Sequence, residues 1–204
     1  RTLTYSDPRT GLIVRCVGVE YRDSPTVEWI VYFKNAGAAD TPIIEGIEAI
    51  DVQLVRSGDE EFVLHRTKGD TCAIDSFQPL EQTLAPNMSV HLAPGGGRPT
   101  NGENPYWNFQ TGNKGVIVVL GWPGQWLSKF ERDAERALRI RAGQELTHFT
   151  LHPGEEVRSP LVVLQFYEGD WLRGQNLWRR WMVAHNIPRP DGKLVPTHYG
   201  ACWS

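Results

Sequence analysis

A polar loop carrying two aromatic residues holds the side chains best suited to bind a ligand. Residues Gly95–Gln110 read GGGRPTNGENPYWNFQ, so donors, acceptors and flat rings lie within one short stretch. Sugar recognition uses this mixture, because amphipathic rings offer flat faces for stacking while polar groups bond the hydroxyls. We therefore predict a carbohydrate-contacting loop with five candidate side chains: Arg98, Asn101, Asn104, Tyr106 and Trp107. The alternative is that the two rings tuck under the loop and anchor it.

Other chemistries find little support in the residue patterns. The glycines at Gly95–Gly97 are followed by no GK[ST] motif, and they do not join a strand to a helix, which argues against a phosphate-binding loop. No GxSxG elbow is present. His148 and His152 are four residues apart, but the segment has neither an HExxH motif nor a Cys/His quartet. We expect no metal and no cofactor.

Acidic residues are numerous, yet their spacing defines no catalytic pair. Glycoside hydrolysis requires two facing carboxyl groups. Glu48 and Asp51 are separated by an odd number of residues, so they point to opposite faces of a regular strand. Most of the other acids lie beside turns, where carboxylates are commonly solvated. No catalytic pair can therefore be defended from spacing alone.

The elements that must position the loop read as short strands separated by turns. Val27–Phe33 is rich in β-branched and aromatic residues, and Gly115–Gly121 is apolar enough for a buried strand. Ile43–Val55 fits one long strand with a kink near Gly46. Ser57–Glu60 resembles a hairpin turn, and Glu61–Arg66 is then the returning strand.

Further strands are expected along the rest of the chain, at Leu12–Val19, at Trp126–Phe130, from about Ala134 to Arg141, at Gln144–Leu151 and at Leu161–Phe166. A helix is an alternative at Glu131–Arg141, because its residues are good helix formers. This regular spacing predicts a mainly β protein, an antiparallel β-sandwich.

One segment changes to helical periodicity. In Gly174–Asn186 the residues Leu177, Trp178, Trp181, Met182 and His185 share one face of an amphipathic helix. Pro188 and Pro190 end it, and a Pro-rich linker follows. We expect a sandwich over residues 1–172, a connecting helix over 173–187, and over 188–204 a linker with the first strand of a second domain.

Composition narrows the class of partner. The formal net charge is −3 with both signs interspersed, which gives no support to binding of nucleic acid or an anionic membrane. No apolar run approaches the length of a transmembrane helix. Cys16, Cys72 and Cys202 lack CxxC spacing and are expected to be buried free thiols, although one disulfide stays open. Both ends of the chain look cut, so we expect a piece of a longer protein.

Five motifs in fixed order carry a family resemblance. They are NAGAADTPIIEGIEAIDVQL (Asn35–Leu54), GGGRPTNGENPYWNFQ (Gly95–Gln110), GVIVVLGWPGQW (Gly115–Trp126), RAGQELTHFTLHPGEEVRSPLVVL (Arg141–Leu164) and NLWRRWMVAHNIP (Asn176–Pro188). Together they resemble the N-terminal β-supersandwich domain of melibiase-type α-galactosidases, glycoside hydrolase family 36 and its relatives. The resemblance covers nearly the whole chain.

The resemblance implies a division of labour between two domains. In that family a (β/α)₈ barrel follows the supersandwich and carries both catalytic Asp residues, so these would lie beyond Ser204. A loop of the sandwich leans over the barrel and helps to close the sugar pocket, and the matching loop here is Gly95–Gln110. The implied partners are an α-galactoside-type carbohydrate, the chain's own barrel and, for this loop, a second copy in a homo-oligomer.

Two other functions stay open at this point. The chain could be a stand-alone carbohydrate-binding module that uses Trp107 as a stacking platform, or a purely structural or oligomerisation domain. The compartment is not determined by the sequence. Degradation of polysaccharides favours a secreted or periplasmic location over a cytoplasmic one, and no signal segment supports either.

Overall fold

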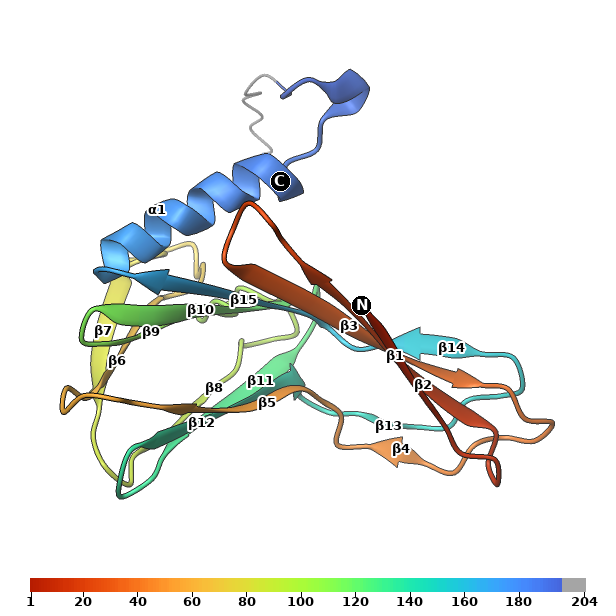
Figure 1. The fold of residues 1–204 in the computed structure, drawn as a ribbon. Coiled ribbons are helices and arrows are strands. Elements are labelled where there is room, and N and C mark those ends of the chain that lie inside the picture. The colour runs from red at the N-terminus through yellow and green to blue at the C-terminus, as the bar shows by residue number, and fades with distance from the viewer. Residues whose placement is uncertain (196–204) are drawn as a thin grey trace.

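The computed structural model describes residues 1–195, which form two main layers of antiparallel strands. The larger sheet has nine strands in the order β1-β2-β3-β15-β10-β9-β6-β7, with β14 also paired to β3 (Figure 1). Their bounds are β1 Thr2–Ser6, β2 Leu12–Glu20, β3 Thr26–Asn35, β6 Phe62–Thr67, β7 Pro79–Leu84, β9 Tyr106–Thr111, β10 Lys114–Gly121, β14 Glu156–Arg158 and β15 Leu161–Glu168.

A smaller sheet faces one half of the larger one. Its four strands follow the order β5-β12-β11-β8, with bounds β5 Glu48–Val55, β8 Ser89–Leu92, β11 Trp126–Arg132 and β12 Ala137–Gln144. A two-stranded ribbon of β4 (Ile44–Glu45) and β13 (His148–Phe149) continues this layer beneath the other half (Figure 1). The predicted antiparallel β-sandwich is confirmed.

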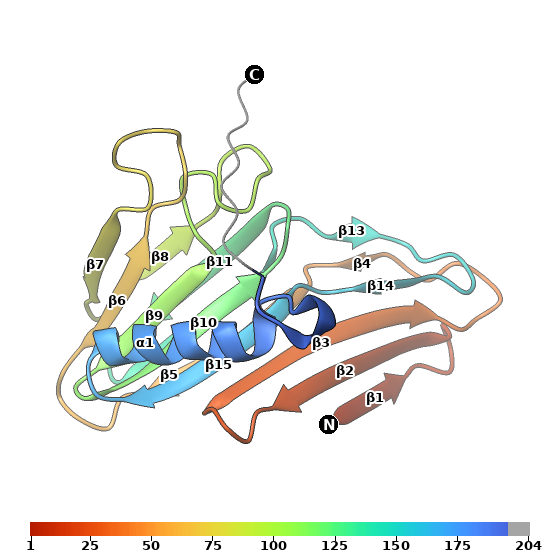
Figure 2. The same ribbon diagram turned by 90° about the horizontal axis from the view of Figure 1, so that it is seen from above.

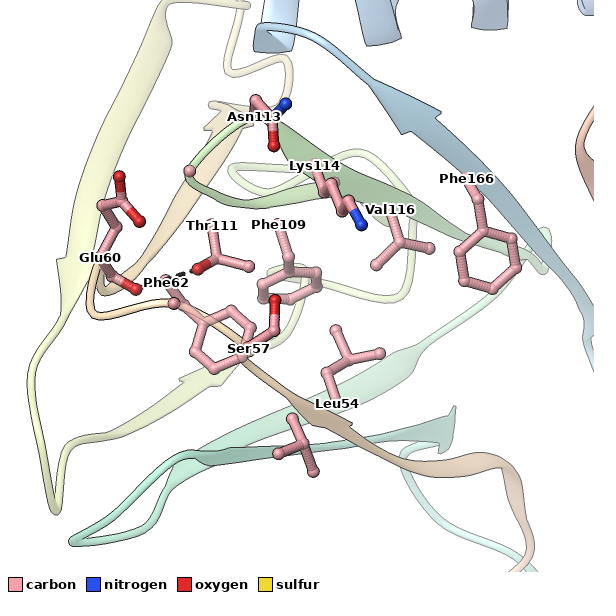
Figure 3. A pocket seen from close by; sticks show the side chains of 14 residues that line it. Leu54, Ser57, Glu60, Phe62, Phe109, Thr111, Asn113, Lys114, Val116 and Phe166 are labelled. Carbon is pink, nitrogen blue, oxygen red and sulfur yellow. Dashed lines mark hydrogen bonds between the residues drawn. The ribbon is translucent and has the colours of Figure 1, made fainter.

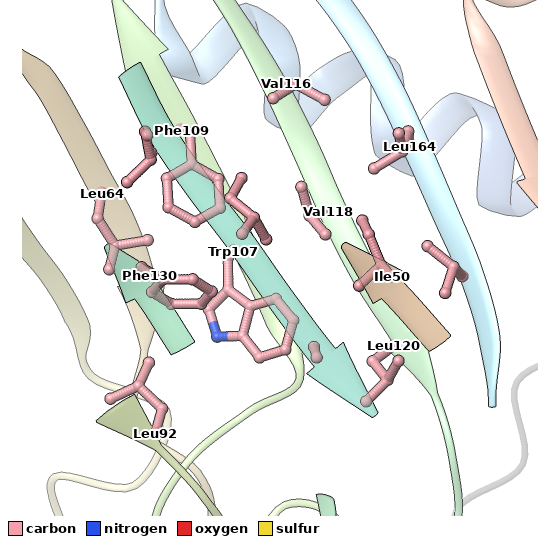
Figure 4. Close-up of a cluster of buried hydrophobic side chains, with 14 of the residues drawn as sticks. Ile50, Leu64, Leu92, Trp107, Phe109, Val116, Val118, Leu120, Phe130 and Leu164 are labelled. Atoms are coloured by element: carbon pink, nitrogen blue, oxygen red, sulfur yellow. The ribbon is translucent and has the colours of Figure 1, made fainter. Parts of the chain in front are cut away.

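The core fills the space between the two sheets. Trp107 and Phe109 of β9 point inward against Phe130 of β11, with ring centroids 5.2 Å and 5.0 Å from that ring (Figure 4). Val116 and Val118 of β10 extend the same cluster. On the other face of β10, Ile117 is fully buried. The strand is therefore covered on both faces, which is why its sequence is a continuous apolar run.

The covering element on that outer face is the helix α1, Trp171–Trp181 (Figure 2). It begins three residues before the predicted start because the Asp170 side chain accepts a hydrogen bond from the Arg173 N–H, an N-cap. Gly174 and Trp181 are its buried residues, and Gly174 sits directly on the Tyr167 ring. A π-helical turn, Met182–Asn186, and a 3₁₀ turn, Pro190–Gly192, follow. None of the helices within residues 1–195 combines the length and apolar character that crossing a bilayer requires.

Three predicted connections differ from the structure. Ser57–Glu60 is not a hairpin turn, since β5 pairs with β12 while β6 pairs with β7 and β9. Ile50 and Phe62 face the same core from opposite layers, so the chain crosses between sheets there, and an alternating pattern cannot distinguish this arch from a hairpin.

The expected kink at Gly46 is a full break, because its φ of +63° ends β4 and β5 starts in another sheet. In Gln144–Leu151 only His148 and Phe149 pair as a short strand beyond the end of β12. The strand expected from about Ala134 forms as β12, starting at Ala137. The strand predicted near the C-terminal end lies outside the described residues.

Candidate functional site

Two loops lie side by side at one end of the sandwich and form the candidate site (Figure 2). One joins β6 to β7 over residues 68–78, and the other joins β8 to β9 over residues 93–105. The Asp70 N–H donates to the Thr100 carbonyl at 2.7 Å, and Lys68 forms an isolated β-bridge with Glu103. Gly69 has no room for a side chain, since a Cβ there would lie 2.1 Å from the Thr100 oxygen. We call these two segments the paired loops.

The loop over 93–105 is tied to the start of β11. The indole N–H of Trp126 donates to the Pro99 carbonyl at 2.7 Å. The Gln125 amide bonds both sides of the loop, donating to the Pro94 carbonyl at 2.7 Å and accepting from the Gly97 N–H at 2.9 Å. This polar loop is therefore held in one conformation by side chains of a neighbouring strand.

The loop over 68–78 is held by one carboxylate and one hydroxyl. Asp70 accepts from the Cys72 N–H at 2.8 Å and from the Ser76 hydroxyl at 3.0 Å. Cys72 and Phe77 have positive φ angles of 57° and 63°, a conformation that costs non-glycine residues about 1–3 kcal/mol each. The result is a constrained loop whose apolar side chains, Ile74 and Phe77, are exposed.

Two ion pairs hold four of the charged groups at the paired loops. Arg66 bonds Glu103 at 2.6 Å, and Lys68 bonds Asp75. The N–H of Cys72, the hydroxyl of Ser76 and the nearby Arg98 hold the pKa of Asp70 below its ordinary value, and the Lys68 ammonium lowers the pKa of Asp75. Both carboxyl groups are thus ionised at neutral pH, so neither can serve as a proton donor there.

The three polar candidates have different positions in the paired loops. Arg98 is exposed at the tip of its loop, beside Asp70. Asn101 donates its amide to the Gly95 carbonyl and closes the tip. Asn104 donates to the Thr67 hydroxyl at 2.7 Å and to the Lys68 carbonyl at 2.8 Å. Arg98 is therefore the candidate that presents its charged group to solvent, whereas the two asparagines hold the loops in shape.

The two aromatic candidates are anchors. Trp107 lies within β9 with 0% of its surface exposed, between Trp126 and Phe130 (Figure 4). Its indole offers no face for a sugar, so the stacking role predicted for it is not available in this fold. Tyr106 packs beneath α1, donating its hydroxyl to the Gln175 side chain at 2.9 Å, and burial raises its pKa. The loop itself is shorter than Gly95–Gln110, because β9 begins at Tyr106.

Sequence reasoning identified one of the paired loops and missed the other. Residues 68–78 are not among the segments that the sequence marks as functional. Their link to Thr100 joins positions thirty residues apart, and no local pattern carries that information. The strained Cys72 and Phe77 likewise have no sequence signature.

Histidines do not converge on a metal site within the described residues. His148 pairs with Glu45 at 2.9 Å, and His152 pairs with Asp40 at 2.8 Å. In residues 1–195 no group of three or more potential ligand side chains is suitably placed to hold a metal ion. Cys16 and Cys72 are free thiols, and Cys72 is exposed rather than buried as predicted.

Several solved structures with a similar fold are named α-galactosidases. The family 36 α-galactosidase AgaA from Geobacillus stearothermophilus matches 82% of this chain with a TM-score of 0.68 and 16% sequence identity. The α-galactosidase from Lactobacillus brevis matches 89% with a TM-score of 0.73 and 16% identity. The galactosidase domain of the α-galactosidase–sucrose kinase AgaSK matches 82% with a TM-score of 0.67 and 18% identity.

The likeness confirms the predicted resemblance at the level of the fold. This chain spans about a quarter of each of these structures, 24% of AgaA and 25% of the Lactobacillus protein. No family model matches the sequence, and no curated protein matches it either.

Proposed function

We propose that this chain is the non-catalytic N-terminal domain of a retaining glycoside hydrolase that acts on α-galactosides. The observation that carries the proposal is the shared fold. The sandwich and its helix correspond to one quarter of structures named α-galactosidases, with a TM-score of up to 0.73 over nearly the whole chain. The remaining three quarters of such an enzyme would carry the chemistry.

The domain plan follows the one expected from the sequence. The expected plan has the sandwich over residues 1–172 as the accessory domain and 173–187 as the connecting helix, and the helix itself starts at Trp171. Residues 188–204 would lead into a (β/α)₈ barrel. Because α1 is already packed on β9, β10 and β15, its exposed side, with Leu172 and Arg180, is the surface available to that barrel.

The acids of the paired loops support a non-catalytic role. A retaining glycosidase uses two carboxyl groups ~5–5.5 Å apart, one of which must be protonated at the working pH. Here Asp70 and Asp75 have lowered pKa values, and Glu103 is bound to Arg66. We assign both catalytic carboxyl groups to the barrel.

The paired loops are the part of this domain that we propose to line the sugar pocket. Their tip carries one exposed guanidinium, Arg98, whose five N–H donors suit sugar hydroxyls. Attachment through Gln125 and Trp126 fixes the backbone on both sides of Arg98, so binding a sugar needs to order only the Arg98 side chain.

The test uses the full-length enzyme and this chain side by side. The 204-residue chain alone should not hydrolyse p-nitrophenyl α-galactoside at any pH. In the full-length enzyme, Arg98→Ala should raise KM about fivefold, the equivalent of one lost hydrogen bond of ~1 kcal/mol. Arg9→Ala is the matched control, since Arg9 is an exposed arginine on the turn between β1 and β2.

Two outcomes would count against the proposal. Turnover by the purified chain alone would refute the accessory role. Equal KM values for the Arg98 and Arg9 variants would remove the paired loops from the sugar pocket while leaving the domain assignment intact.

A further inference from the structure

A separate cavity opens at the end of the sandwich away from the paired loops (Figure 3). It has a volume of about 460 Å³, within the range of small-molecule sites. Its apolar wall is formed by Leu54, Phe62, Phe109, Val116 and Phe166. The paired loops adjoin the start of β9 at Tyr106 and the cavity begins at Phe109 of the same strand, so about 10 Å of strand separates them.

The cavity exists because the smaller sheet ends before the larger one. Phe166 lies on the inward row of β15 with Val162 and Leu164, yet 46% of its surface is exposed. The facing strand β5 ends at Val55, which is itself 67% exposed, and the chain then crosses to the other layer. An apolar floor of core side chains is therefore open to solvent.

One charged side chain points into this apolar space. Lys114 shares the inward face of β10 with Val116 and Val118, since alternate residues of a strand share a face. Figure 3 shows its ammonium group directed between Phe109 and Val116, toward the centre of the cavity. None of the ion pairs formed within residues 1–195 includes Lys114.

Two acids belong to the surroundings of Lys114, and neither forms an ion pair with it. Glu168 is its cross-strand neighbour on β15 but does not line the cavity. Glu60 lines the mouth, where its carboxylate lies against Gly112 of the turn between β9 and β10 (Figure 3). Lys114 is an exposed residue, so its ammonium group stays hydrated while the apolar wall of the cavity lies beside it. A ligand that supplies an anion and an apolar body together matches this combination.

We propose that this cavity binds a small amphipathic carboxylate. The alkyl or aryl part lies against Phe62, Phe109 and Phe166, and the carboxylate accepts hydrogen bonds from Lys114. Thr111 and Ser57 line the mouth of the cavity, where their hydroxyl groups can hydrogen-bond the ligand's carboxylate or the water around it. This assignment does not depend on the α-galactosidase relationship, because no residue of the paired loops takes part.

The experiment compares octanoate with octanol, two probes of equal chain length. Calorimetric titration of this chain should show octanoate binding more tightly, with a difference that shrinks at high salt. Lys114→Gln should weaken octanoate about fivefold, as expected for a partly exposed ion pair, and leave octanol unchanged. Phe166→Ala should weaken both probes. Lys34→Gln is the control, since Lys34 is an exposed lysine on β3.

The Phe166 and Lys114 side chains are both partly in solvent, so we expect their variants to fold. Circular dichroism of each variant checks this. In an NMR titration, octanoate should shift the amides of Thr111, Lys114 and Phe166. Failure of octanoate to bind at millimolar concentration would overturn the proposal. So would equal affinities of the Lys114→Gln and Lys34→Gln variants.

Discussion

The paired loops approach so closely at Gly69 that one added methyl group should measurably lower the free energy of unfolding. In Gly69→Ala the new Cβ would lie 2.1 Å from the Thr100 oxygen and 2.6 Å from the Glu103 nitrogen. Non-bonded heavy atoms normally stay about 3.5–4.0 Å apart, so one loop must move by roughly 1.4 Å. Both obstructing atoms belong to the backbone, so no side chain can rotate away to make room.

The expected cost combines three terms. Overpacking costs about 1–3 kcal/mol, and loss of the bond from the Asp70 N–H to Thr100 costs about 0.5–1.5 kcal/mol. Replacing a glycine also restricts the unfolded chain, which offsets about 0.4–1 kcal/mol. The net destabilisation is therefore about 0.5–4 kcal/mol. A central value of about 2 kcal/mol lowers Tm by about 4–8 °C for a domain of this size.

Thermal and urea denaturation measure this effect, with Gly95→Ala as the matched control. Gly95 lies in the same pair of loops, but its nearest neighbour to an added Cβ is the Asn101 amide nitrogen at 3.4 Å, an ordinary contact. We expect the control to stay within about 0.5 kcal/mol of the parent chain. Equal stability of the two variants would show that the loops are not held together at Gly69.

Three further predictions test how the scaffold supports the site. Trp126→Phe keeps an aromatic ring in the core but removes the N–H that donates to the Pro99 carbonyl. Amide hydrogen exchange at Gly97 should then become faster, while exchange in β10 stays slow. Unchanged exchange at Gly97 would contradict this prediction. Glu61→Gln removes the carboxylate charge and one of the two acceptors that Glu61 offers to the fully buried Arg132 guanidinium, which keeps Asp133 as its other ion-pair partner. The loss of one hydrogen bond to a charged group should cost about 1.5–3 kcal/mol in urea denaturation, and unchanged stability would refute the buried-pair argument. Burial lowers the pKa of His65 in the folded chain from its ordinary value of 6.5. As the pH falls below about 6.5 the unfolded chain therefore takes up a proton first, and the free energy of unfolding should decrease. His65→Phe should flatten that part of the pH profile of stability, and an unchanged slope would exclude His65 as its source.

Much of the fold follows from patterns within single segments. The apolar run in Gly115–Gly121 could belong only to a strand covered on both faces, and β10 is such a strand. The helix was predictable because its apolar residues recur with a helical period. The crossing at Ser57–Glu60 was not, because a hairpin and an arch between layers share the same alternation and differ only in which strand lies opposite.

The site was harder to predict because the composition of a segment does not reveal which way each side chain points. The polar neighbours of Trp107 favour a loop. Trp107 also precedes Phe109 by two residues, however, and residues at that spacing share one face of a strand. That alternation was the available signal that Trp107 points into the core. The contact between Gly69 and Thr100 had no signal, since the fit of two backbones depends on how both loops are held.

Because Trp107 is buried, it can affect the proposed sugar-binding loop only indirectly, through the residues packed against it. Its ring packs edge-on against Trp126 at 5.4 Å, and the Trp126 indole N–H extends from the core to the Pro99 carbonyl beside Arg98. Because protein cores are close-packed, the packing of Trp126 on Trp107 constrains the orientation of the Trp126 indole. The core of the sandwich therefore constrains where the tip of the loop stands. An aromatic residue can thus belong to a binding site without touching the ligand, and its substitution would alter that site through the position of the backbone at Pro99.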